Sequence, residues 1–184
     1  MNRPESGLRH RRHRGLTVRE IALFAMFGSL MMVSDFIMNI VPNVHLVGVM
    51  IVIFTLTYRV KALCPIYVYV LLIGLVEGIG PWWVPYLYIW TVLWALVMLL
   101  PKRMPKWLAP VVYAAVCGLH GFCFGLLWAP YEMLLMSYSW EQITVWWRMG
   151  FLLADIPHGI GNLVGSTLIL PLVSLIRKLD KHAS

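Results

Sequence analysis

Polar side chains are scarce in the apolar stretches of this 184-residue chain, and three of them could bind a ligand together. Asp155, His158 and Asn162 have the spacing i, i+3 and i+7, which places them on one face of a helix. There Asp155 can orient the imidazole, and Asn162 offers both a donor and an acceptor. Pro157 and Gly159 loosen the backbone at the same place, as in the interrupted helices that line transporter sites. The alternative is a kink whose polar groups satisfy one another.

Aromatic side chains form a second candidate group. Trp90 and Trp94 follow Tyr86 at intervals of four residues, so the three rings share a helical face and could stack a flat ligand. For the outermost rings, Trp82, Trp83 and Tyr86, an ordinary belt at the membrane interface is the alternative.

The elements that must hold these side chains are membrane helices, because 60% of the residues are hydrophobic and only 12% are charged. We expect an all-α bundle of six transmembrane helices, placed between breaks in the apolar pattern. The expected spans are 20–41, 44–58, 62–80, 83–100, 108–128 and a last one ending near residue 176.

The basic residues predict the orientation of this bundle. Fourteen of the fifteen Lys and Arg residues fall in four clusters, at residues 3–19, 59–61, 102–106 and 177–181. The positive-inside rule places all four clusters, and both termini, in the cytoplasm, with the bundle in the plasma membrane. Because the clusters sit at span ends rather than on one face, we expect no nucleic-acid partner. We therefore divide the chain into a basic tail (1–18), a single membrane domain (19–178) and a second cytoplasmic tail (179–184).

Distance from these clusters indicates how deep each polar residue lies. Asp35, His45, Glu77 and His120 all fall toward the outer side, as the Asp155 group does. Ionisable residues inside spans usually face a bundle interior or a wet cavity, so this one-sided set predicts a pocket that opens outward. A channel would need polar lining through the inner half as well. For Asp35 and Glu77, a position among the lipid headgroups is the alternative reading.

The last apolar region, from about residue 142 to 176, is too long for one crossing of roughly 20 residues. We expect its outer part, within about 130–153, to form a loop and short helix that could act as a lid. Trp147 and Arg148 could then close over the ligand, with Arg148 favouring a carboxylate or phosphate. Alternatively, Arg148 extends to the lipid headgroups.

Two segments resemble the substrate-binding S components of energy-coupling factor (ECF) vitamin transporters. They are Leu16-Thr-Val-Arg-Glu-Ile-Ala-Leu-Phe-Ala-Met-Phe-Gly-Ser29, similar to the first helix of that family, and Phe151-Leu-Leu-Ala-Asp155-Ile-Pro-His158-Gly-Ile-Gly-Asn162, similar to the last. The family's first helix often carries an Ala-x-x-x-Ala surface that docks on the transmembrane coupling subunit. The matching positions here are Ala25 and Ser29, so serine replaces the second alanine.

The resemblance extends over residues 16 to 178 and implies a binding subunit, in the plasma membrane of a prokaryotic cell, for ATP-driven uptake of a vitamin or related micronutrient. Its partners would be a transmembrane coupling subunit and two ATPase subunits. This chain has no Walker sequence, so we expect it not to be an enzyme, and to need ATP and Mg²⁺ only in its partners. We expect no metal or cofactor in the chain itself. Ligand contacts are expected from Trp90, Trp94, Asp155, His158 and Asn162.

The sequence leaves two other classes of protein open. An intramembrane enzyme is one, because His158-x-x-x-Asn162 is similar to one element of the CAAX-type membrane proteases and His120 could add a ligand or base. However, the paired glutamates of those enzymes are missing and Glu77 stands alone, so the catalytic set is incomplete. A structural subunit without a ligand is the other. It predicts that substitutions in the outer pocket change stability but not uptake.

Overall fold

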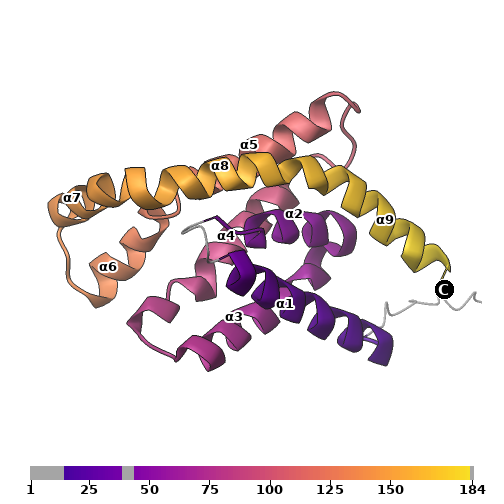
Figure 1. The fold of residues 1–184 in the computed structure, drawn as a ribbon, viewed down its shortest axis with the longest axis horizontal. Helices are drawn as coiled ribbons and strands as arrows, with labels where there is room; N and C mark the ends of the chain where they lie inside the picture. Colours follow the sequence, from indigo (N-terminus) through magenta and orange to yellow (C-terminus); the bar gives the residue numbers. More distant parts are fainter. Residues whose placement is uncertain (1–14, 39–43, 183–184) are drawn as a thin grey trace, which may run out of the picture.

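The computed structural model describes residues 15–38 and 44–182, and these residues form helices, turns and connecting segments without a β-strand (Figure 1). The expected all-α class is confirmed for this part of the chain. Most of the predicted N-terminal tail lies outside the described residues.

The longer helices follow the apolar stretches of the sequence. They are α1 (Val18–Met38), α2 (Val47–Tyr58), α3 (Leu63–Glu77), α4 (Tyr86–Leu99), α5 (Leu108–Phe122), α6 (Ala129–Leu135), α7 (Trp140–Gly150), α8 (Ile156–Gly165) and α9 (Ile169–His182). Short 3₁₀ turns connect several of them: η1 (Arg59–Ala62), η2 (Pro81–Trp83), η3 (Leu126–Trp128) and η5 (Ser166–Leu168). A π-helical turn, η4 (Phe151–Asp155), joins α7 to α8.

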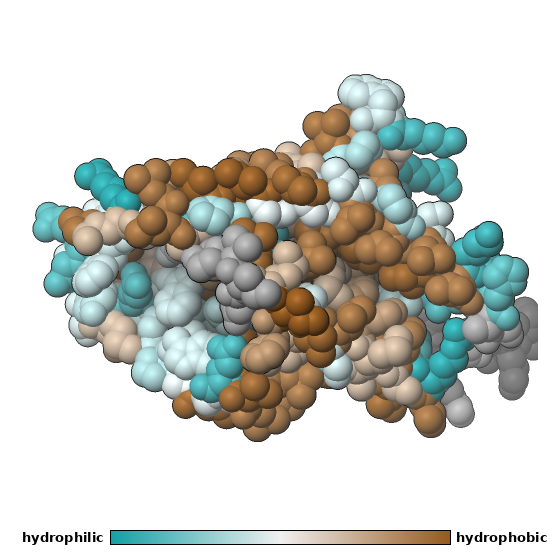
Figure 2. Space-filling view, viewed as in Figure 1, coloured by the Kyte–Doolittle hydropathy of each residue, from teal (hydrophilic) through white to brown (hydrophobic). Residues whose placement is uncertain are grey.

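Several helical stretches are long and apolar enough to cross a membrane. Four qualify among the described residues: Val18–Met38, Val47–Glu77, Pro81–Leu99 and Trp140–His182. A fifth is present if Leu108–Phe122 and Leu126–Leu135, which meet at a bend of 67°, form one broken span. Figure 2 shows hydrophobic side chains across the middle of the molecule and hydrophilic ones gathered toward its two ends. These features are consistent with a protein embedded in a membrane.

The number of qualifying stretches is smaller than the six expected spans because some of the helices are short. At about 1.5 Å per residue, the 12 residues of α2 extend over roughly 18 Å, well below the roughly 30 Å of a hydrocarbon core. The chain turns after α2 at Arg59, which has a positive φ of 56°. Counted together, α2 and α3 make up a single qualifying stretch.

Charged residues from separate parts of the sequence meet at one end of the bundle. Lys61 forms an ion pair with Glu20 at the start of α1. Arg19 lies 3.5 Å from Asp180, and the Tyr58 hydroxyl donates to the same carboxylate at 3.0 Å.

Two arginines tie further segments to this end. Arg59 donates to the Met98 carbonyl at 3.1 Å, and Arg177 donates to the Leu56 carbonyl at 2.7 Å. Lys102 lies beside Arg59 and Arg177 on a shared groove. We call this region, formed by residues 17–20, 56–61, 98–102 and 177–181, the basic end.

Helix contacts define the path of the chain away from the basic end. Glu20 of α1 meets Lys61 of η1, just before α3, and farther on Asp35 accepts a hydrogen bond from Tyr69 of α3 at 2.8 Å, so α1 and α3 run in the same direction. Between these contacts Gly28 lies directly against Val68, and an added Cβ would come within 2.4 Å of that side chain. Because there is no room for a side chain at Gly28, the two helices pack closely at this point, and α1 and α3 form one packed unit.

Helices α5 and α8 run in opposite directions and are in contact through their backbones. A Cβ on Gly121 would lie 2.8 Å from the Cα of Gly159, so the two backbones touch at this crossing. Toward the basic end, the Asn162 amide donates to the Cys117 carbonyl at 3.1 Å. This crossing fixes the positions of His120 and His158, which lie on either side of it.

Residues 130–153, expected as a loop with one short helix, form two helices. Ser139 begins α7 with a capping box, in which its side chain accepts from the Gln142 amide and the Gln142 side chain accepts from the Ser139 amide. The helical path does not stop after α7 but continues through η4 into α8, which lies in line with α7 in Figure 1. Helices α6 and α7 lie far from the basic end, and we call this the pocket end.

Candidate functional site

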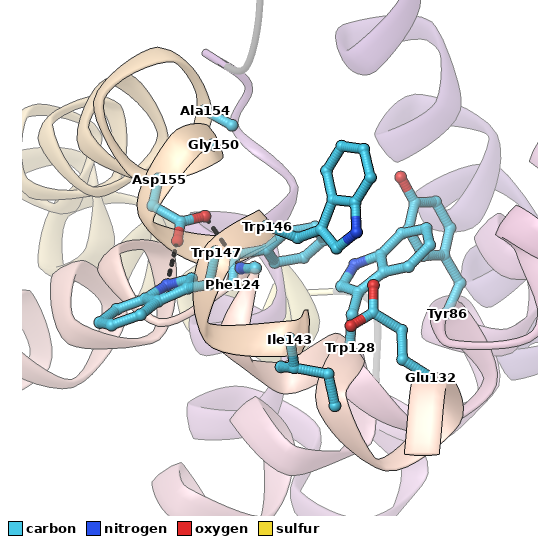
Figure 3. Close-up of a pocket in the computed structure, with 11 residues that line it drawn as sticks. Tyr86, Phe124, Trp128, Glu132, Ile143, Trp146, Trp147, Gly150, Ala154 and Asp155 are labelled. Atoms are coloured by element: carbon cyan, nitrogen blue, oxygen red, sulfur yellow. Dashed lines mark hydrogen bonds between the residues drawn. The ribbon is translucent and has the colours of Figure 1, made fainter. Parts of the chain in front are cut away.

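A cavity of about 310 Å³ lies at the pocket end between α4, α6 and α7 (Figure 3). Its lining consists of five aromatic residues, two carboxylates and four small or aliphatic residues: Tyr86, Phe124, Trp128, Trp146, Trp147, Glu132, Asp155, Gly125, Ile143, Gly150 and Ala154. The volume is at the lower end of the range for small-molecule sites, and rings with a few polar groups are the usual lining of such sites.

The point at which α5 ends determines the position of the cavity wall that η3 and α6 form. The helix stops at Phe122, and the chain bends sharply before continuing as η3 and α6. The Tyr88 hydroxyl of α4 donates to the Leu127 carbonyl at 2.7 Å and so holds η3 against α4. Trp128 and Glu132, four residues apart, then both face the cavity.

The opposite wall depends on Asp155, which is only 2% exposed. One carboxylate oxygen accepts from the Gly125 amide and the other from the Trp147 indole, each at 2.8 Å. These bonds differ from the expected pairing of Asp155 with the His158 imidazole. Asp155 instead fixes the Trp147 ring in the cavity wall.

Two rings separate the cavity from a deeper layer. Tyr86 and Phe124 line the cavity and also contact Trp90, with ring centroids 5.7 and 5.3 Å away. Phe124 lies 4.5 Å from His158 and 6.1 Å from His120 as well. The Phe124 ring is therefore the partition between the cavity and the buried residues beneath it.

The buried layer contains five polar atoms without a hydrogen-bond partner. They are His45 Nδ1, Trp90 Nε1, His120 Nδ1, His158 Nε2 and Asn162 Oδ1. The rings are neighbours, with centroids 4.4 Å apart for His45 and His158 and 5.9 Å apart for Trp90 and either His45 or His120. We call these five residues the histidine cluster. Buried polar groups are normally paired, and each exception costs about 1–3 kcal/mol, so five in one place indicate a site for a ligand or water.

Other hydrogen bonds hold this layer in place. His120 Nε2 faces the Ile89 carbonyl at 3.1 Å, and because a carbonyl only accepts, Nε2 carries the proton and Nδ1 is a free acceptor. The side-chain nitrogen of Asn162 donates to the Cys117 carbonyl, which leaves Asn162 Oδ1 as a second acceptor without a partner. Among the described residues, no three His, Cys, Asp or Glu side chains are arranged to hold a metal ion.

The structure brings together seven of the predicted site residues. Tyr86, Trp147 and Asp155 line the cavity, and Trp90, His120, His158 and Asn162 belong to the histidine cluster.

Four other predicted residues lie elsewhere. The Trp94 indole donates to the Arg59 carbonyl at 3.1 Å, at the basic end. Arg148 is exposed and outside the cavity lining, and Glu77 is exposed at the end of α3. Asp35 is bonded to Tyr69.

Several lining residues were not among the predicted contacts. Phe124, Trp128 and Glu132 lie in the segment assigned to the end of a span and to the lid, and Trp146 precedes the predicted Trp147. A usable signal was the spacing of Trp128 and Glu132, which puts a ring and a carboxylate on one helical face. His45, expected only as an outer polar residue, joins the histidine cluster.

Helix α1 presents the predicted docking positions on its outer surface. Ala25 and Ser29 are both exposed, and the Ser29 hydroxyl donates to the Ala25 carbonyl at 2.9 Å. Because that hydroxyl is already bonded, the two positions form a smooth, small surface between the exposed side chains of Met26 and Leu30.

The fold and site define a helical protein, consistent with a membrane location, that has a ligand-sized aromatic cavity above a buried polar cluster. No protein-family model, curated protein or solved structure matches this chain.

Proposed function

We propose that this chain is a substrate-binding subunit for ATP-driven uptake of a vitamin or related micronutrient, of the ECF S-component type. The observation that carries the proposal is the aromatic cavity at the pocket end, directly above the five unpartnered atoms of the histidine cluster. A ligand there would stack on the rings and, once Phe124 moves, satisfy the buried polar atoms.

The proposed topology has six crossings with both termini in the cytoplasm. Its support is the gathering of Arg19, Lys61, Lys102 and Arg177 at the basic end, opposite the cavity. The positive-inside rule assigns that end to the cytoplasm, so the cavity faces outward.

Transport would depend on partner subunits. In the proposed mechanism α1 docks on a transmembrane coupling subunit through Ala25 and Ser29, and two ATPase subunits supply the energy. The loaded subunit then reorients and releases its ligand into the cytoplasm. The exposed, small-residue surface of α1 supports this docking assignment.

Binding accounts for the site better than catalysis. The two cavity carboxylates, Glu132 and Asp155, make no hydrogen bond to a histidine in the described part of the chain, and both Asp155 oxygens are engaged with other donors. An acid–base pair of the kind that an intramembrane hydrolase needs is therefore not supported.

A ligand screen tests the proposal. The purified chain in detergent is screened for thermal stabilisation by water-soluble vitamins and their precursors, with native mass spectrometry to detect a retained ligand. We expect one compound class to raise the melting temperature of the wild type and to lose this effect in Trp128→Ala, while Trp107→Ala, an exposed tryptophan outside the cavity lining, behaves as wild type. If no compound shifts the transition and no ATPase-bearing module co-purifies, the proposal is wrong.

A further inference from the structure

We propose that the cavity selects an organic cation, a flat or compact apolar group that carries a fixed or protonated positive charge. This inference rests on the proposed function, because it takes the cavity as the ligand site. The juxtaposition of the Glu132 carboxylate with a set of aromatic rings carries it.

The charged groups in the lining are all acidic. Glu132 and Asp155 are carboxylates, and no Lys, Arg or His belongs to the lining formed by the described residues. Arg148, the residue expected to attract an anion, is exposed and does not line the cavity. An anionic ligand would therefore enter against two like charges and find no cation in the wall.

The two carboxylates differ in how their charge is balanced. Asp155 already accepts two hydrogen bonds, from Gly125 and Trp147. Glu132 is half-buried, and its carboxylate has no hydrogen-bond donor within the described ranges 15–38 and 44–182. In Figure 3 its oxygens lie beside the Trp128 ring, on the cavity side of α6. A half-buried carboxylate among rings is stabilised most by an opposite charge.

The rings around Glu132 suit the same partner. The negative faces of Trp and Tyr rings attract a cation within about 6 Å of the ring centroid, and Trp does so best. Three of the five aromatic residues in the lining are tryptophans. Rings would hold the apolar part of a neutral ligand equally well, but a cation also balances the charge of Glu132, which a neutral hydrogen-bond donor does not.

The charge distribution of the whole molecule also favours a cationic ligand. Five of the eight acidic residues lie away from the basic end, namely Asp35, Glu77, Glu132, Glu141 and Asp155, whereas Arg148 is the only Lys or Arg between residues 107 and 176. This separation gives the pocket end a negative potential, which raises the local concentration of cations and repels anions.

Three compounds of nearly equal shape test the inference: nicotinate as the anion, nicotinamide as the neutral ring and 1-methylnicotinamide as the cation. Binding to the purified full-length chain is measured by quenching of tryptophan fluorescence. We expect the cation to bind about ten-fold more tightly than the neutral ring, and the anion most weakly. Glu132→Gln keeps the side-chain shape and should remove most of the cation preference. Glu141→Gln, which removes an exposed carboxylate outside the lining, should retain it.

The outcomes separate this inference from the proposed function. Tighter binding of nicotinate, or an unchanged cation preference in Glu132→Gln, would overturn the inference but leave the cavity as a ligand site. If none of the three rings quenches the cavity tryptophans of folded protein, the inference is overturned, whereas the cavity as a ligand site is rejected only if the thermal-shift screen fails as well. Glu132→Asp keeps the charge, so recovery of the preference in that variant supports an electrostatic role over a change of shape.

Discussion

The indole nitrogen of Trp147 donates a hydrogen bond of 2.8 Å to the carboxylate of Asp155, eight residues further along the chain. This bond joins the last turn of α7 to the start of α8 across the π-helical turn η4. The other oxygen of the same carboxylate accepts from the Gly125 amide, so one buried side chain connects α7 and the start of α8 to the segment that precedes η3.

Replacing Asp155 should therefore loosen the cavity wall. In Asp155→Asn, one of the two N–H donors faces an amide NH₂ group instead of an oxygen, and we expect a loss of about 1–3 kcal/mol in the free energy of unfolding. Thermal unfolding in detergent measures this loss, and Glu141→Gln is the surface control. A melting temperature equal to that of the wild type would show that the two hydrogen bonds do not hold the wall.

The histidine cluster should affect stability and binding in opposite directions. His158 Nε2 is buried without a partner, so His158→Leu removes an unfavourable group and should leave the empty protein as stable as the wild type or more so. The same change should weaken ligand binding at least about ten-fold if the ring contacts ligand. Thermal unfolding and ligand titration on the same preparation measure both effects.

His120→Leu is the comparison for that experiment. It removes the hydrogen bond from Nε2 to the Ile89 carbonyl, so it should destabilise the empty protein by roughly 1 kcal/mol. Strong destabilisation by His158→Leu with unchanged ligand affinity would identify the cluster as a structural feature only.

The surface of α1 should matter for transport and not for binding. Ala25→Leu places a larger side chain on an exposed position, so it should reduce coupled uptake severely while ligand affinity stays within about two-fold. Ala115→Leu makes the same change at an exposed position of α5 and should leave uptake unchanged. Uptake and binding are measured for both variants in cells and in detergent. Normal uptake with Ala25→Leu would place the partner contact on another helix.

Membrane orientation can be read from single cysteines. After Cys64, Cys117 and Cys123 are replaced by serine or alanine, a cysteine at Glu141 should react with an impermeant maleimide in intact cells. A cysteine at Lys102 should react only after permeabilisation, because the basic end is expected in the cytoplasm. The reverse labelling pattern would mean that the cavity faces the cytoplasm, which would contradict an uptake function.

Residue patterns predicted helices well and tertiary partners less well. The periodicity that put Tyr86 and Trp90 on one face is visible in their ring contact, with centroids 5.7 Å apart. The same face continues to Trp94, but α4 extends beyond the cavity, and Trp94 reaches Arg59. Periodicity gives the direction of a side chain and not the depth of the pocket.

Helix ends were the weakest part of the prediction. The fifth span was expected to continue to residue 128, whereas α5 ends at Phe122 and the chain bends before α6. Apolar composition does not change at this bend, so hydropathy could not locate it. The bend is what brings Trp128 and Glu132 into the cavity.

The backbone geometry of the π-helical turn has a direct effect on the cavity. Residues eight apart in a regular α-helix are offset by about 80° around the axis, and a π turn, with its additional residue, reduces that angle. If residues 151–154 became a regular α-helix without losing a residue, α7 would rotate by roughly 100° relative to α8, whereas deleting one residue at the same time would leave the angle nearly unchanged. With the rotation of about 100°, Trp146 and Trp147 would turn away from Glu132 although every cavity side chain is still present, so the shape of the cavity depends on the π geometry of a five-residue segment as much as on its composition.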